Sequence, residues 1–561
     1  MTSTKYIFVT GGVVSSLGKG IISASIGKLL QARGYEVTIQ KFDPYINIDP
    51  GTLNPYEHGE CYVTEDGFET DLDLGHYERF TGIRTTRSNS VTTGRIYQSV
   101  IERERRGDYL GKTIQVVPHI TDEIKRRMLR VEPQNLDFVI TEIGGTIGDI
   151  ESAPFMEAIR QLRWELGRRA VCVHLTYVPY LRAAGELKTK PTQHSVKELQ
   201  SMGIQPDILV LRTEHHLDDG VRMKVASFCN VDLACVVQSE DMASIYEVPV
   251  NMQKQGLDTA ILKRIEGLKD GRIEGLKNGR IEGWKDGRME GLKDGSGMAS
   301  WLRFLDRQRR ATREVSIGLV GKYDLQDAYK SIRESLSLAG VYHDVKVRVC
   351  FVNSEAITDE NVAEQLDGLA GVIICPGFGQ RGIEGKIVAA EYTRTHDIPT
   401  FGICLGMQMM VIEFARHVLG YEGACSRESL PPSPLDGAAV CVIDLMEEQK
   451  CVTQMGGTMR LGAYDCKVME GSRAYEAYGG LSLVRERHRH RYEFNNAYRE
   501  EFEAKGMRCV GTNPAADLVE IVEIADRRWY IGTQFHPEYS STVLRPHPLF
   551  MSFVKECIKK Y

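Results

Sequence analysis

The chain contains a cysteine whose neighbours are typical of an activated nucleophile. Cys404 lies in the run Phe401-Gly402-Ile403-Cys404-Leu405-Gly406, directly after an apolar segment that predicts a strand. A reactive side chain at a sharp strand-to-helix turn needs small flanking residues, because the backbone is strained there and the substrate must approach closely. Gly402 and Gly406 provide that space, so the sequence predicts a nucleophile elbow at Cys404.

A base and a carboxylate that suit this nucleophile occur far downstream. His536 and Glu538 belong to the sequence Gln-Phe-His-Pro-Glu at residues 534–538. Thiol acyl transfer needs a base to accept the thiol proton and an acidic group to orient that base. A lone buried cysteine is usually inert packing, and this is the alternative. The combination of the three side chains with the flanking glycines favours a catalytic thiol.

A third element is the apolar run 373–375, which leads into Pro376-Gly377-Phe378-Gly379. Such a loop presents backbone N–H groups to a developing oxyanion. Pro376 has no N–H to donate, so a donor from this loop must be Gly377, Phe378 or Gly379. The N–H of Leu405, beside the nucleophile, is the expected second donor.

With these three elements, the C-terminal half resembles the class I glutamine amidotransferases, which hydrolyse glutamine through a thioester and release ammonia. The resemblance implies that Cys404 is the nucleophile, that His536 is the base and that Glu538 orients the base. It also implies that Glu428 holds the substrate ammonium, and that Gln408 and the basic segment containing Arg491 contribute to glutamine and activator binding. One departure concerns the oxyanion loop, where Pro-Gly-Gly-Phe-Gly is expected and a single glycine precedes Phe378.

The N-terminus contains a glycine-rich loop typical of phosphate binding. An apolar run, residues 5–10, leads into the loop 11–20, and a helix is expected to begin near Ile21. Successive N–H groups and the positive end of such a helix bind phosphate, and Lys19 reaches the transferred charge. Gly20 replaces the usual serine or threonine metal ligand, so we expect magnesium to find carboxylates elsewhere. A plain glycine-rich turn is the alternative. The predicted contacts are Ser15, Ser16, Leu17, Gly18, Lys19 and Gly20.

Carboxylates at two places suit this metal. Asp71 and Asp73 lie close together, and Glu142 follows an apolar run that would deliver it to the ligand-binding edge of a parallel sheet. Hard oxygen ligands beside a polyphosphate suit Mg²⁺. We predict Asp73 and Glu142 as metal ligands and Lys41 as a second phosphate contact. Solvated turn carboxylates and a surface lysine are the alternatives.

Longer segments carry a more specific resemblance. The chain, outside one insert, resembles the CTP synthases, and the segments that carry this resemblance include residues 11–20, 41–47, 58–60, 69–80, 142–151, 188–199 and 485–493. The resemblance implies contacts to the pyrimidine nucleotide and to the ATP purine. For the pyrimidine nucleotide these are Lys188, Lys190, Gln193 and Lys224, with Asp149 and Glu151 at its ribose or ring, and for the purine Arg212.

The family resemblance implies one coupled reaction. ATP phosphorylates the 4-oxygen of UTP, with Mg²⁺, Lys19 and Lys41 neutralising charge, and ammonia then displaces phosphate. Both substrates need activation, because the pyrimidine oxygen is a poor leaving group and ammonia is mostly protonated at neutral pH. The resemblance further implies GTP as an allosteric activator, CTP as a feedback inhibitor and assembly into homotetramers.

Composition agrees with this interpretation. A chain of 561 residues with 42% hydrophobic and 26% charged residues predicts a soluble protein of two or more domains. A net charge of -6 argues against nucleic acid as the main partner. Thirteen cysteines without a C-x-x-C pair indicate reduced thiols in the cytoplasm. We expect no signal peptide, and no run approaches the roughly 18 apolar residues that a membrane span needs.

Alternating β-forming and helical runs in both halves predict an α/β fold with two parallel-sheet domains. The resemblance makes the first, residues 1–263, a synthetase domain of the P-loop or dethiobiotin-synthetase-like, Rossmann type, and the second, residues 299–561, a class I glutamine amidotransferase domain. Between them, residues 264–298 contain four near-copies of the octad Arg-Ile-Glu-Gly-Leu-Lys-Asp-Gly. The two glycines of each octad cost roughly 1 kcal/mol each in a helix. We predict a flexible linker, with a partner-binding surface as the alternative.

Two other functions stay open at this point. One is an ATP-dependent amidotransferase with a different acceptor, which the segment 188–193 disfavours. The other is a catalytically idle homologue that forms filaments as a structural protein. The presence of Cys404, His536, Glu538 and Lys19 argues against the second function.

Overall fold

The computed structural model describes residues 4–131, 136–265, 284–285, 288–289, 297–430, 440–446 and 459–559. The chain forms two compact units. The first comprises Met1–Asp49 and Asp73–Leu305, and the second comprises Pro50–Leu72 and Asp306–Tyr561. Most of the segment 264–298, which contains the octads and was predicted to be a flexible linker, lies outside the described residues.

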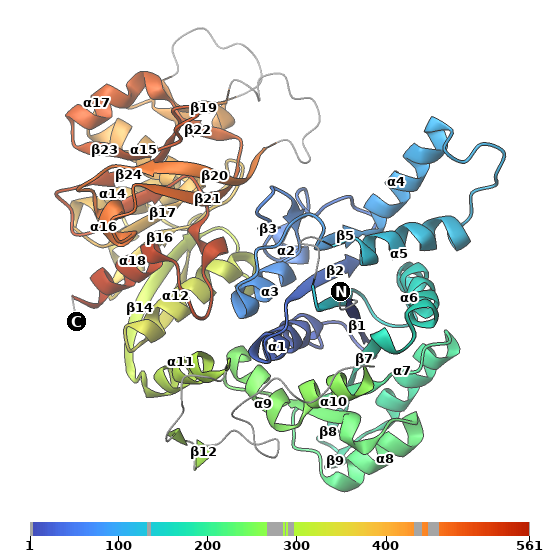
Figure 1. Ribbon diagram of the computed structural model, residues 1–561. Coiled ribbons are helices and arrows are strands. Elements are labelled where there is room, and N and C mark those ends of the chain that lie inside the picture. The colour runs from blue at the N-terminus through green and yellow to red at the C-terminus, as the bar shows by residue number, and fades with distance from the viewer. Residues whose placement is uncertain are drawn as a thin grey trace. The chain divides into compact units, whose positions relative to one another are not determined.

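The first unit is built on a sheet of seven parallel strands (Figure 1). Such a sheet is buried on both faces, which accounts for its nearly continuous apolar strands. In spatial order the strands are β11 (Val236–Glu240), β10 (Ile208–Thr213), β7 (Ala170–Tyr177), β1 (Lys5–Gly11), β6 (Phe138–Ile143), β2 (Val37–Asp43) and β5 (Ser90–Thr92). The carboxyl ends of β1, β2 and β6 therefore lie side by side.

Helices cover both faces of this sheet. An aromatic cluster of Phe80, Tyr246 and Trp301 fills the core beside α1, and the Trp301 Nε1 donates to the Tyr246 carbonyl oxygen at 2.8 Å. The other face buries apolar side chains of α4 to α7. The helices are α1 (Lys19–Ala32), α3 (Asp73–Thr81), α4 (Thr93–Arg106), α5 (Thr121–Leu129), α6 (Ala153–Leu166), α7 (Lys190–Ser201), α8 (Asp219–Cys229), α9 (Val248–Lys254), α10 (Leu257–Arg264) and α11 (Ala299–Arg310). Two short pairs complete the description: β8 (Tyr180–Leu181) with β9 (Glu186–Leu187), and β12 (Trp284–Lys285) with β13 (Arg288–Met289).

The second unit has a nine-stranded sheet that is parallel through its first five strands and antiparallel through the rest. The parallel part is β15 (Val345–Asn353), β14 (Arg313–Gly321), β16 (Gly371–Ile374), β17 (Thr400–Ile403) and β25 (Tyr530–Thr533). The antiparallel part is β24 (Val519–Ile524), β23 (Met507–Thr512), β20 (Arg460–Val468) and β21 (Leu483–His490). A smaller sheet contains β18 (Cys425–Ser426), β19 (Cys441–Leu445) and β22 (Tyr492–Phe494).

Two apolar cores lie on the two faces of the larger sheet. One face packs against α13 (Val362–Gln365), α14 (Ile383–Thr395), α15 (Leu405–His417) and α17 (Arg499–Ala504). The other face packs against α12 (Lys330–Tyr342), α16 (Arg473–Ala477) and α18 (Pro548–Ile558). The predicted α/β fold with two parallel-sheet domains is confirmed, and the antiparallel strands extend the second sheet beyond that prediction.

Residues 50–72 pack with the second unit, although they lie within the range expected for the synthetase domain. They contain α2 (Pro55–His58), β3 (Tyr62–Val63) and β4 (Glu69–Thr70). The Tyr62 hydroxyl donates to the Tyr539 carbonyl oxygen at 2.8 Å, and Arg487 donates to the Val63 carbonyl oxygen at 2.8 Å. These hydrogen bonds explain why residues 50–72 belong to the second unit. None of the described helices is long and apolar enough to cross a membrane.

Candidate functional site

Cys404 occupies the strained turn that the sequence predicts. It joins β17 to α15 with a φ of 54°, a conformation that costs a non-glycine residue on the order of 1–3 kcal/mol. A Cβ on Gly402 would lie 2.2 Å from the Met410 sulfur. A Cβ on Gly406 would lie 1.9 Å from the Ile374 carbonyl oxygen. The two glycines therefore allow α15 to pack closely against the sheet. This role is additional to the space for substrate that the sequence predicts.

His536 and Glu538 come close to Cys404 because β17 and β25 are neighbouring parallel strands. The Cys404 N–H donates to the Thr533 carbonyl oxygen at 2.7 Å, and His536 follows shortly after β25. Its Nδ1 lies 2.7 Å from Oε1 of Glu538. Burial lowers the pKa of His536, but the negative charges of Glu538 and Cys404 outweigh it and raise the pKa to about 10. The site thus favours a protonated imidazole beside the Cys404 sulfur.

The loop after β16 brings candidate oxyanion donors to this centre. The Gly379 N–H donates to Oε1 of Glu428 at 2.8 Å. No acceptor within the described residues takes the N–H of Gly377 or Phe378. A Cβ on Gly377 would lie 3.6 Å from Leu405, whose own N–H is in the first turn of α15 and lacks a helical acceptor. Gly377 and Leu405 are therefore the adjacent pair that best fits the predicted donors.

A cavity of about 640 Å³ opens over this centre. This volume is within the usual range of small-molecule pockets and accommodates a free amino acid. Its lining contains the thiol, the imidazole and the carboxylate, together with aromatic and basic side chains. Those side chains include Tyr323, Phe378, Arg381, Arg489 and Tyr539.

Three residues expected to serve glutamine or activator binding, Glu428, Gln408 and Arg491, lie apart from the lining of this cavity. The Gln408 side chain is buried, and its Nε2 donates to the Tyr492 carbonyl oxygen at 2.8 Å and to Oε1 of Gln534 at 3.2 Å. Arg491 is half-buried at the turn between β21 and β22. Gln408 thus supports the segment around Tyr492.

In the first unit, the loop between β1 and α1 has the backbone expected of a phosphate cradle. Val13 and Ser16 have positive φ values of 78° and 59°, which are uncommon for non-glycine residues. Gly18 caps α1 in the left-handed conformation, so the helix begins at Lys19, slightly earlier than the sequence predicts. The buried Lys19 ammonium donates to the Gly145 carbonyl oxygen at 2.7 Å. Burial lowers the pKa of Lys19, and Glu142 opposes this shift.

Gly20 stands where the usual motif has a serine or threonine hydroxyl, and it leaves room for the carboxylate of Asp73. A Cβ on Gly20 would lie 2.2 Å from Oδ1 of Asp73, so only glycine lets that carboxylate approach the loop. The Lys41 ammonium is hydrogen-bonded to Asp73 and lies 3.6 Å from Oε1 of Glu142. Burial raises the pKa of both carboxyl groups. At Asp73 the nearby positive charges, that of Lys41 above all, outweigh burial and lower the pKa, whereas the pKa of Glu142 stays raised. Both predicted metal ligands therefore meet beside Lys41, and this oxygen donor set fits Mg²⁺.

We expect Gly20→Ser, which restores the hydroxyl of the usual motif, to reduce CTP formation by about tenfold or more. The added Cβ would displace Asp73 from the loop and disturb its bond to Lys41. The measurement is the rate of CTP formation with an ammonium salt. Gly423→Ser is the matched control, because Gly423 has an ordinary φ and open space around its Cβ position. Unchanged activity in Gly20→Ser would contradict this account of the glycine.

The residues expected to bind the pyrimidine nucleotide gather on α7 and α8. Lys188 precedes α7, Lys190 begins it, and Gln193 is buried in its first turn. The Lys190 ammonium lies 5.9 Å from the ring centroid of Phe228 on α8, the helix that also carries Lys224. A Cβ on Gly12 would overlap Ser195 of α7, so α7 lies against the phosphate loop.

The remaining predicted nucleotide contacts lie at the same edge of the sheet. Asp149 and Glu151 follow β6; Asp149 accepts a hydrogen bond from the Thr146 N–H at 2.8 Å, and Glu151 is exposed. Arg212, near the end of β10, forms an ion pair with Asp241. The structure therefore brings these residues to the edge where parallel α/β sheets bind ligands.

Two residues of this centre were missed by the sequence interpretation. Asp43 lies 3.7 Å from the Lys41 ammonium, and the Tyr77 hydroxyl donates to Oε2 of Glu142 at 2.5 Å. Asp43 was detectable, because alternate residues of a strand share one face and Lys41 lies two positions earlier. Tyr77 gave no signal, since its role depends on how α3 packs against β6.

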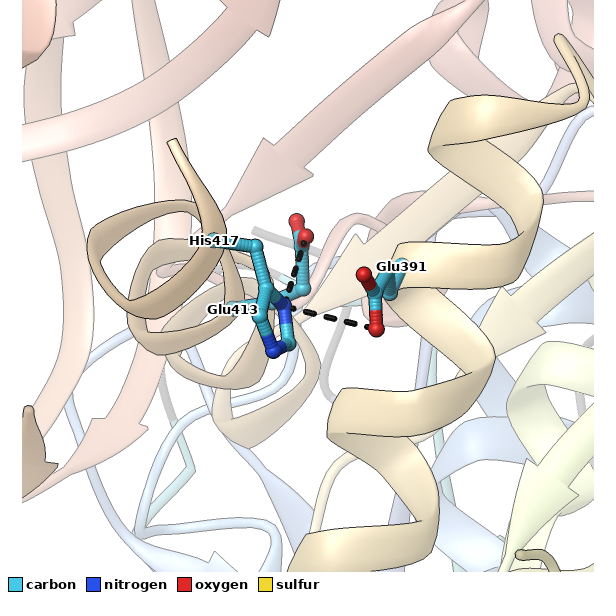
Figure 2. Close-up of side chains that lie close together, drawn as sticks. All are labelled: Glu391, Glu413 and His417. Carbon is cyan, nitrogen blue, oxygen red and sulfur yellow. Dashed lines mark hydrogen bonds and ion pairs between the residues drawn. The ribbon is translucent and has the colours of Figure 1, made fainter. Parts of the chain in front are cut away.

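A separate group of potential metal ligands lies at the end of α15 remote from Cys404. Figure 2 shows Nδ1 of His417 facing the carboxylates of Glu413 and Glu391, at 3.3 and 3.4 Å. The fully buried Glu413 carboxylate, however, already accepts three hydrogen bonds from Arg394, whose positive charge balances that of the carboxylate. The group is therefore accounted for as an ion-pair network that joins α14 to α15.

The two halves of the chain match two different protein families. Residues 5–266 match the family described as CTP synthase N-terminus, and residues 324–556 match glutamine amidotransferase class-I. A CTP synthase of Bacteroides thetaiotaomicron is 68% identical over 100% of this chain and 99% of its own length. One of Porphyromonas gingivalis is 60% identical over the same shares. The glutaminase domain of Trypanosoma brucei CTPS with bound acivicin is 35% identical over 44% of this chain and 94% of its own, with a TM-score of 0.40. The chain belongs to the CTP synthase family.

Proposed function

We propose that this chain makes CTP by joining two half-reactions, with Cys404 releasing ammonia from glutamine and the Lys19 loop activating UTP with ATP. The chain is an enzyme, a glutamine-dependent ligase of the CTP synthase family. Its reaction is the ATP-dependent amination of UTP to CTP with glutamine as the nitrogen donor. The observation that carries the assignment of residues is the pairing of Cys404 with His536 and Glu538 across β17 and β25.

In the glutaminase reaction, the Cys404 sulfur attacks the carboxamide carbon of glutamine. The protonated imidazole of His536 gives its proton to the amide nitrogen, which then departs as ammonia, and Glu538 keeps the ring oriented through Nδ1. The oxyanion that forms at the carbonyl is stabilised by the N–H groups of Gly377 and Leu405. Water then hydrolyses the thioester and releases glutamate.

In the synthetase reaction, the loop N–H groups and Lys19 bind the ATP phosphates while Lys41 neutralises charge during transfer. The phosphoryl group moves from ATP to the 4-oxygen of UTP. Ammonia then attacks the ring carbon that bears this oxygen and displaces phosphate. Asp73 and Glu142 would hold Mg²⁺, which supplies charge neutralisation on the phosphates. The pyrimidine nucleotide is held by Lys188, Lys190, Gln193 and Lys224, with Asp149 and Glu151 nearby, and Arg212 lies against the purine.

Several features of the family complete the proposal. GTP activates the glutaminase, CTP inhibits as product, and the enzyme works as a homotetramer in the cytoplasm. The described cysteines are all free, which suits a reducing compartment. Glu428 and Arg491 serve substrate and activator binding in the glutaminase half.

The direct test is CTP formation from UTP, ATP and Mg²⁺, with glutamine plus GTP in one reaction and an ammonium salt in a second. We expect product in both. A reaction without ATP is the control for each. Product with ammonium alone would reject the glutaminase assignment, and product in neither would favour the idle structural homologue.

A further inference from the structure

A buried lysine lies beneath the active-site loop of the glutaminase half. Lys386, in the first turn of α14, is 0% exposed, and its Nζ donates to the Cys375 carbonyl oxygen at 2.6 Å. Further along the loop, the buried Lys322 donates to the Phe378 carbonyl oxygen. The two ammonium groups therefore bind carbonyl oxygens on either side of the Pro376–Gly377 peptide, which carries the Gly377 N–H.

The Lys386 ammonium has no carboxylate partner among the described residues. The titratable groups that face it are Cys375 after β16, Lys322 after β14 and Cys404 before α15. Burying an ammonium without a counter-charge costs several kcal/mol, and buried charges are normally paired. The nearby anion that the reaction provides is the Cys404 thiolate, followed by the oxyanion. The cation is therefore placed to interact with negative charge that forms during turnover.

We propose that Lys386 is a positioning residue for glutamine hydrolysis, holding the Cys375 carbonyl so that the Gly377 N–H faces the oxyanion while its charge stabilises that intermediate. The inference rests on the proposed role of Cys404 as nucleophile. When the thiolate adds to the carboxamide carbon, the electron pair of the C=O bond moves to oxygen. A preorganised N–H and a fixed positive charge stabilise that oxygen without reorganising during the step.

The protonation state of Lys386 gives this role a pH signature. Burial lowers its pKa to about 8; Cys375 and Cys404 oppose the shift, and Lys322 adds to it. The ammonium is charged below pH 8, so its contribution is present there and is lost as the pH rises through 8. The imidazolium of His536, with a pKa of about 10, keeps its charge over the same interval. Glutamine-dependent turnover should therefore decline above pH 8 in the intact chain.

The test compares Lys386→Met and Lys386→Arg in the full chain, with the exposed Lys346→Met as matched control. We expect Lys386→Met to lower the glutamine-dependent kcat by about 10²-fold, in line with loss of an oxyanion stabiliser. The KM for glutamine should change by less than about threefold, and CTP formation from an ammonium salt should be unchanged. Lys386→Arg should restore most of the kcat and move the decline above pH 8 to a higher pH.

A wild-type kcat and an unshifted decline in Lys386→Met would overturn the proposal. If Lys386→Met also loses ammonium-dependent activity, its folding is affected. The role of Lys386 is then tested by the pH profiles of Lys386→Arg and of the intact chain. An Arg variant with the wild-type decline, or an intact chain whose glutamine-dependent rate is flat from pH 7 to above 9, rejects the role of Lys386. Failure of the proposed function is distinguishable, because glutamine-dependent turnover would then survive Cys404→Ala.

Discussion

Replacement of Cys404 by alanine is expected to lower glutamine-dependent CTP formation by at least about 10⁴-fold while leaving ammonium-dependent formation within twofold of the intact enzyme. Without the sulfur no thioester forms, and loss of the nucleophile of a catalytic triad has effects of this size or larger. Free ammonia bypasses the thioester, since it enters the reaction after that step. The measurement is the rate of CTP formation with each nitrogen source at a fixed concentration of UTP and ATP.

The matched control for this prediction is Cys350→Ala. Cys350 is a half-buried free cysteine on β15 and does not line the active-site cavity. Both activities should persist in this variant. Equal loss of both activities in Cys404→Ala would mean that Cys404 is a structural residue, because its strained turn supports the packing of α15 on the sheet.

Replacement of Lys19 by alanine is expected to lower CTP formation from both nitrogen sources by about 10²–10³-fold or more. Its ammonium is buried between the phosphate loop and the Gly145 carbonyl oxygen, where a charge acts strongly on a transferring phosphoryl group. Both nitrogen sources depend on the same activated UTP, so the loss should be the same for each. The measurement is again CTP formation, with glutamine and with an ammonium salt.

A control separates this effect from unfolding. Lys112→Ala removes an exposed lysine of the same unit and should leave both rates unchanged. The thermal midpoint of Lys19→Ala should stay close to that of the intact chain, because removing a buried ammonium also removes its desolvation cost. Retained activity in a folded Lys19→Ala protein would reject the phosphate-binding assignment.

Much of the fold was readable from local pattern. The run 5–10 and the loop that follows predicted a strand, a glycine turn and a helix, and β1 and α1 have that order. The glycines around Cys404 predicted a strained turn, which has a φ of 54°. The antiparallel strands of the second sheet and the packing of residues 50–72 with that unit were not predicted, because both depend on contacts between segments far apart in the chain.

The candidate sites show the same division. The types and spacings of Cys404, His536 and Lys19 were enough to predict a chemistry for each, because a nucleophile elbow and a phosphate loop are continuous segments. The sequence could also state that Gly20 required a compensating carboxylate. It could not state that Asp73 packs directly on that glycine, since the contact joins α1 to α3.

The sequence by itself determined the family, the two α/β units and the local motifs, because glycine geometry, strand alternation and motif spacing act between near neighbours in the chain. Only the tertiary structure decided which side chains meet. The order of β17 and β25 places His536 beside Cys404, and the packing of α14 buries Lys386 beneath the loop after β16. A lysine in a helix has no sequence pattern that shows whether it faces water or an active site. Whether such a lysine is exposed or buried depends on packing between segments that are far apart in the chain.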